Sequence, residues 1–122
     1  MPDHLRHLAD TPVLACAPDG PPIADERAAT DLLGDAMGLG AEWVALPVER
    51  LPPEFFQLRT GLAGTVVQKF ATYRLGLAVL GEIQSYLDTS TALRDFVFES
   101  NRGRQLWFLP DAEALHTRLT TH

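Results

Sequence analysis

Two short apolar runs open the chain and predict its first two strands. Residues 13–17 are apolar and are followed by a turn rich in proline and glycine, which is the pattern of a buried strand and its end. Residues 5–8 precede this run at a distance that lets the two segments pair as a hairpin turning at Ala9-Asp10.

An amphipathic helix is predicted at residues 25–37, because apolar side chains recur there at three- and four-residue steps. Asp25 is a suitable N-cap for it, and Gly38 marks its stop. The predicted buried face consists of Ala28, Ala29, Leu32, Leu33, Ala36 and Met37.

A strand and a second helix are predicted in the middle of the chain. Residues 42–47 have the apolar pattern of a strand, and the two prolines within residues 51–54 predict a rigid connector after it. The helix that follows starts at Thr60-Gly61. Its predicted buried face consists of Leu62, Val66, Phe70 and Tyr73.

The C-terminal part of the chain continues this alternation. Residues 75–81 are apolar on both alternating faces, which predicts a central strand covered from two sides. A helix is predicted at residues 90–100, a last strand at residues 105–109, and a final helix after them with Asp111 as its N-cap.

Together these elements predict an α/β fold. Strands that alternate with helices require parallel pairing and crossover connections, so we expect a mostly parallel sheet of four to five strands, an N-terminal hairpin and about four helices. A length of 122 residues fits one compact domain, residues 1–122.

Composition narrows the classes of function. Sixteen acidic against ten basic residues give a formal charge of −6, and Lys69 is the single lysine, so we expect no binding to nucleic acid. Cys16 has no second cysteine to pair with, and no apolar run suits secretion or a membrane span. These features predict a cytoplasmic protein with no metal, no cofactor and no membrane partner.

The start of the second helix is the most informative candidate site. Gly61 and Gly64 lie in its first turn, where glycine lowers helix stability, so we expect backbone there to lie close to a sheet or a ligand. Thr60 is either the N-cap or a phosphate acceptor. In the second case, Arg59 and the free amides of the helix would stabilise the phosphate.

Two further groups of polar residues are candidates for a contact. Glu99, Asn101 and Arg102 lie where a helix is expected to meet a strand, and they are either a helix C-cap or a recognition loop. Lys69, with Gln68 beside it, lies four residues before Tyr73, so one helical stripe could carry a contact patch or simply cover apolar surface. The candidate residues are Arg59, Thr60, Gly61, Gln68, Lys69, Tyr73, Glu99, Asn101 and Arg102.

The motif of residues 51–64, followed by Gln68-Lys69-Phe70 and by residues 93–103, resembles the bacterial family catalogued as domain of unknown function 4180. The resemblance covers most of residues 46–108. It implies a family membership and no established activity.

A more distant resemblance concerns the start of the second helix. Residues 60–64 read Thr-Gly-Leu-Ala-Gly and are similar to the Ser-Gly-Leu-Gly turn of the sulfate-transporter and anti-sigma-factor-antagonist (STAS) superfamily. Thr60 stands where those regulators carry a phosphorylatable serine, although Arg59 departs from their usual serine. This resemblance implies a STAS-like fold and a regulatory role.

Three functions from different classes remain open. We favour a STAS-like regulatory or protein-interaction module, since no catalytic group of residues is visible and an enzyme is the less favoured class. The second is a small-ligand protein or enzyme with a pocket between the Thr60 helix start and residues 99–102. The third is a homodimeric scaffold joined through Trp43 or Trp107 near a sheet edge.

Overall fold

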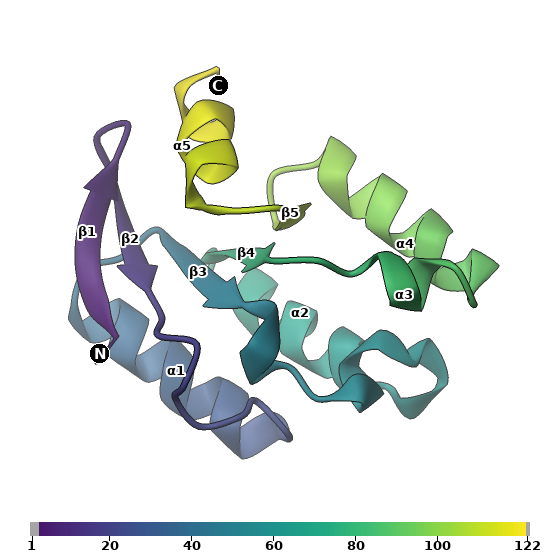
Figure 1. Ribbon diagram of the computed structural model, residues 1–122. Coiled ribbons are helices and arrows are strands. Elements are labelled where there is room, and N and C mark those ends of the chain that lie inside the picture. Colours follow the sequence, from purple (N-terminus) through teal and green to yellow (C-terminus); the bar gives the residue numbers. More distant parts are fainter. Residues whose placement is uncertain (1–2, 122) are drawn as a thin grey trace.

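One five-stranded sheet lies at the centre of the molecule, and its strands are arranged in the order of the sequence (Figure 1). The computed structural model describes residues 3–121. The first two strands pair antiparallel and the later strands continue parallel to the second. The strands are β1 (His4–Leu8), β2 (Thr11–Ala15), β3 (Trp43–Pro47), β4 (Gly76–Leu80) and β5 (Leu106–Leu109).

The N-terminal hairpin is confirmed, and it turns where the sequence predicts. Ala9 and Asp10 connect β1 to β2 with φ angles of 50° and 67°, so both residues adopt the left-handed conformation. Positive φ at both central residues is typical of a type I′ hairpin turn, whose twist matches that of the two strands.

Five α-helices lie within the described residues. The helices are α1 (Glu26–Gly38), α2 (Leu62–Thr72), α3 (Gln84–Leu87), α4 (Thr91–Arg102) and α5 (Ala112–Thr120). Asp25, Ser90 and Asp111 cap α1, α4 and α5 by accepting hydrogen bonds from backbone amides three residues ahead. The sequence therefore predicts four of the helix positions, and α3 is the one it does not show.

The order of the strands decides which face of the sheet each helix covers. Crossovers between parallel strands are right-handed, so helices that join successive neighbouring strands all fall on one face. Side chains of α1, α2 and α4 accordingly share one core, which includes Leu33, Phe70 and Leu93. Among the helices of residues 3–121, α5, which follows the last strand, is the one that covers the opposite face (Figure 1).

The opposite face has a smaller core built around two tryptophans. Trp43 and Trp107 stack with ring centroids 4.1 Å apart, and α5 adds Leu115 and Leu119 beside them. Trp107 is 0% exposed and Trp43 5%. The expectation that either tryptophan is available at a sheet edge for a second copy is therefore wrong, because the rings fill the space under α5.

Two predicted core positions are also wrong. Met37 and Tyr73 were expected on buried helical faces, but they are 51% and 54% exposed. Met37 is in the last turn of α1, and Tyr73 is the C-cap of α2. The periodicity of a sequence continues to the end of a helix, whereas the neighbouring elements that would cover the face do not.

Candidate functional site

Three short 3-10 turns connect β3 to α2 and carry the Arg59-Thr60 segment. They are η1 (Val48–Arg50), η2 (Pro53–Phe56) and η3 (Leu58–Thr60). Phe55 and Phe56 of η2 are buried in the larger core, so their side chains hold η2 against that core. Arg59 and Thr60 are exposed.

The structure corrects the expected cap of α2. Gly61 rather than Thr60 is the N-cap, and its φ angle of +80° explains why a glycine stands there. The Thr60 hydroxyl lies 2.7 Å from the carbonyl of Glu54 and 2.9 Å from that of Gln57, and it accepts a hydrogen bond from the amide of Leu62 at 3.3 Å. Thr60 thus ties η2, η3 and α2 together.

The expectation that backbone at these glycines packs closely against the sheet is wrong. A methyl group added at Gly61 or Gly64 would meet no atom within 4 Å outside the adjoining chain. Gly64 is exposed. Gly61 is explained by its backbone angle, and for Gly64 the structure shows no packing reason.

Arg59 lies at the edge of a hollow that joins two distant parts of the chain. This hollow, of about 450 Å³, is lined by Phe56, Gln57, Leu58, Arg59, Tyr86, Thr89, Ser90 and Ala92. The rings of Phe56 and Tyr86 stack with centroids 4.2 Å apart, so α3 is held against the turn. The sequence did not indicate this hollow, because it depends on α3.

The Gln68-Lys69-Tyr73 stripe has a structural contact at its centre. The Nζ atom of Lys69 lies 3.1 Å from the Oε2 atom of Glu26, so this side chain joins α2 to the start of α1. Gln68 and Tyr73 are exposed. Lys69 is therefore part of a helix–helix ion pair, while the other two side chains remain open to solvent.

The segment around Glu99 is helix rather than loop. Asn101 accepts a hydrogen bond from the amide of Phe108 at 2.7 Å and donates one to its carbonyl at 3.3 Å, so it fixes the end of α4 to β5. Arg102 pairs with Glu99 at 3.4 Å on an exposed surface. The expectation of a loop at these residues is wrong, since α4 continues through Arg102.

The predicted pocket between the start of α2 and residues 99–102 is not formed as expected. Arg59 lines the hollow described above, whereas Asn101 lines a different one with Glu82, Gln84 and Pro110, at the ends of β4 and β5. The two segments therefore serve separate surfaces.

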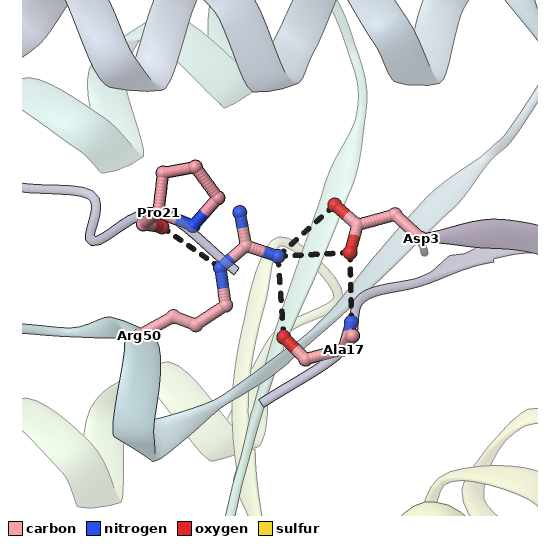
Figure 2. Close-up of polar contacts among 4 residues, drawn as sticks. All are labelled: Asp3, Ala17, Pro21 and Arg50. Atoms are coloured by element: carbon pink, nitrogen blue, oxygen red, sulfur yellow. Dashed lines mark hydrogen bonds and ion pairs between the residues drawn. The ribbon is translucent and has the colours of Figure 1, made fainter. Parts of the chain in front are cut away.

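A partly buried ion pair that the sequence did not indicate fixes the N-terminal end of β1 (Figure 2). Arg50 is 4% exposed, and one of its terminal nitrogens lies 3.0 Å from both carboxylate oxygens of Asp3. Arg50 also donates hydrogen bonds to the carbonyls of Pro21 and Ala17, at 2.8 and 3.3 Å. Asp3 in turn accepts one from the amide of Ala17 at 2.8 Å. No local pattern could have revealed a contact across 47 positions.

Charge and burial set the protonation of this cluster. Burial by itself would raise the pKa of Asp3, but the hydrogen bond from Ala17 and the Arg50 guanidinium outweigh it and lower that pKa. Burial, followed by the nearby Asp3 carboxylate, raises the pKa of the Cys16 thiol to about 12. Cys16 is therefore a neutral, unreactive thiol at neutral pH.

Between residues 3 and 121, no group of three or more His, Cys, Asp or Glu side chains is arranged to hold a metal ion. Within the same part of the chain, no helix combines the length and the apolar character that crossing a membrane requires.

The fold defines the class of this protein as an α/β domain with one mostly parallel sheet. The chain belongs to the family described as Domain of unknown function (DUF4180), whose model matches residues 8–119. The resemblance seen in the sequence motif is thus confirmed. No curated protein and no solved structure matches the chain.

Proposed function

We propose that this chain is a protein-interaction module that presents the Arg59 surface to a protein partner, in a STAS-like regulatory role. We define the Arg59 surface as the eight residues that line the hollow between η2, η3, α3 and the start of α4. One observation carries the proposal. Arg59 is the single charged residue of this lining, and no ion pair joins it to another of the residues between 3 and 121.

The chemistry of the lining suits recognition better than catalysis. It contains amide, hydroxyl and aromatic groups, which give hydrogen bonds and contact area. It holds no carboxylate, imidazole, thiol or amine that could act as a general base or nucleophile near neutral pH. A partner segment with an acidic group would complement Arg59, because a guanidinium pairs well with a carboxylate.

Phosphorylation of Thr60 is the proposed way to regulate this surface. A phosphate would remove the hydroxyl proton that now faces the carbonyls of Glu54 and Gln57, and it would place negative charge beside Arg59. Both effects would change the surface while leaving the buried Phe55 and Phe56 in place. The modification should therefore alter partner binding without unfolding the domain.

Co-purification from the native host would test the proposal. The tagged full chain is compared with Arg59→Ala, with Thr60→Asp and with Arg27→Ala, a matched control at an exposed arginine of α1. We expect the control to retain the partners of the wild type. Arg59→Ala, within the Arg59 surface, and Thr60→Asp, next to it in the chain, should each lose or exchange at least one partner. Identical partner sets in all four samples would refute the Arg59 surface as the site of contact.

A further inference from the structure

A second hollow, of about 280 Å³, lies on the face of the sheet that α5 covers in part. Its lining includes the last residues of β2, β3 and β4, namely Ala15, Pro47 and Leu80, and Ala112 at the start of α5. The hollow therefore lies toward the carboxyl ends of the parallel strands. It is separate from the Arg59 surface, which belongs to the opposite face.

The hollow exists because the side chains of its floor are small. Ala15 of β2 is the register partner of Ala45 of β3, so two alanines lie next to each other on this face. Two residues before Ala45, on the same face, Trp43 fills the space under α5. On this face of the sheet, the large side chain at position 43 of β3 is therefore packed under α5, whereas the small side chain at position 45 leaves a hollow.

A cation lies at the rim of this apolar floor. Arg6 of β1 is the register partner of Val13 of β2, which places it on the same face as Ala15. Arg6 is exposed, and no ion pair joins it to another residue of the described chain. The net charge of the chain, −6, does not favour anions, so the local guanidinium of Arg6 is what makes this apolar hollow complementary to an apolar anion.

We propose that this hollow binds a small organic acid with an apolar tail. The tail would rest on Ala15, Ala45 and Leu80, and the carboxylate would face Arg6. The volume is close to the lower end of the range for small-molecule sites, about 300 Å³, so the tail is short. The proposal stands independently of the Arg59 surface and adds a ligand of defined chemistry to the proposed function.

Titration of the isotope-labelled full chain with octanoate, followed by amide NMR, would test the site. We expect saturable shifts at Ala15, Ala45 and Leu80, and none at Arg59. Octan-1-ol and octylammonium have the same apolar tail without the negative charge. We expect octan-1-ol to bind about three- to fivefold more weakly than octanoate, the effect of one ion pair at a solvent-exposed rim, and octylammonium more weakly still.

Two variants and a matched control assign the binding to this hollow. Arg6→Gln should weaken octanoate by the same three- to fivefold factor and remove its preference over octan-1-ol, whereas Arg27→Gln on the opposite face should change neither. Ala15→Leu should fill the floor and weaken binding by at least about tenfold. If this variant is unstable in urea, Arg6→Gln still decides the case, since its side chain is exposed.

Several outcomes would overturn the proposal. Shifts that do not saturate, octylammonium binding as tightly as octanoate, or Arg6→Gln behaving like the wild type would each refute an acid site here. An anionic lipid surface also combines apolar tails with negative charge. We therefore expect no co-sedimentation with phosphatidylglycerol vesicles, and binding to vesicles without a response to octanoate would refute the free acid as the ligand.

Discussion

The two faces of the sheet are closed in different ways. The face under α1, α2 and α4 is packed by aliphatic and phenylalanine side chains, which three crossover helices bring together. The face under α5 is packed at one end by the stacked Trp43 and Trp107, and it is left hollow at the other end above Ala15 and Ala45.

This difference follows from strand order rather than from local sequence. A sheet whose strands follow the chain order receives all its crossover helices on one face. The other face depends on the single helix that follows β5, and α5 has nine residues. The rings of Trp43 and Trp107 fill the space where α5 covers the sheet, and the uncovered part is the hollow above Ala15 and Ala45.

The largest expected effect comes from deleting the aromatic centre of either core. Trp107 and Phe70 are both 0% exposed, and replacing either by alanine should lower the free energy of unfolding by about 3–5 kcal/mol. Trp107→Ala should cost more than Phe70→Ala, because Trp107 also donates a hydrogen bond to the carbonyl of Gly103 at 2.7 Å and stacks on Trp43. Urea titrations measure both.

The control for this pair is Phe98→Ala on α4. Phe98 is 64% exposed, so its removal should change stability by less than about 1 kcal/mol. A loss below about 1 kcal/mol for Trp107→Ala would show that the α5 face contributes little to the fold.

The next effect tests what holds β1 beside the hollow. Arg50→Met removes the donor to Asp3, Pro21 and Ala17, and it should destabilise the fold by about 3 kcal/mol, near the lower end for a broken buried pair because Asp3 keeps some contact with water. The matched control, Arg102→Met, breaks an exposed pair with Glu99 and should cost less than about 0.5 kcal/mol. Equal costs in urea for the two variants would contradict this role of Arg50.

A smaller loss of stability is expected from a substitution beside Trp43, where the packed part of the α5 face meets the hollow. A methyl group at Gly76 of β4 would lie 2.6 Å from the Cε3 atom of Trp43, so Gly76→Ala should displace the tryptophan stack and cost about 1–3 kcal/mol. The near-ultraviolet circular dichroism of the two tryptophans should change with it. An unchanged tryptophan spectrum together with wild-type stability would mean that the stack adapts without strain.

The Asp3–Arg50 pair also predicts a dependence of stability on pH. The pKa of Asp3 is lowered in the folded state, so the unfolded chain takes up this proton at a higher pH than the folded chain does. Its contribution is therefore present at neutral pH and is lost as the pH falls through the lowered pKa of the folded state. Urea midpoints between pH 6 and pH 3 should fall less steeply for Asp3→Asn than for the wild type, and parallel curves would contradict the linkage.

The smallest expected effect is a gain in stability. Gly64 in α2 is exposed, and its added methyl would meet no neighbour within 4 Å, so Gly64→Ala should stabilise the fold by about 0.5–1 kcal/mol. The urea midpoint should rise while the slope stays constant. A loss of stability would show that the outer surface of α2 is packed after all.

Local chemistry in the sequence determined most elements of the fold. Asp25, Ser90 and Asp111 cap helices where the sequence predicts their starts, and Ala9-Asp10 turns the hairpin. These features depend on residues a few positions apart, because a cap or a turn is closed by hydrogen bonds along the adjoining chain. The family motif of residues 51–64 is likewise a run of neighbouring residues, so it could be recognised from the sequence.

Tertiary structure decided where the candidate surfaces lie. Arg50 meets Asp3 across 47 positions, Arg59 shares a hollow with Tyr86, and Arg6 shares one with Leu80. Neither the exposure of Gly64 nor the burial of Trp107 could be read from periodicity alone. The physical reason is that a residue's own sequence neighbours set its backbone conformation, whereas its burial and its partners depend on which distant elements pack against it.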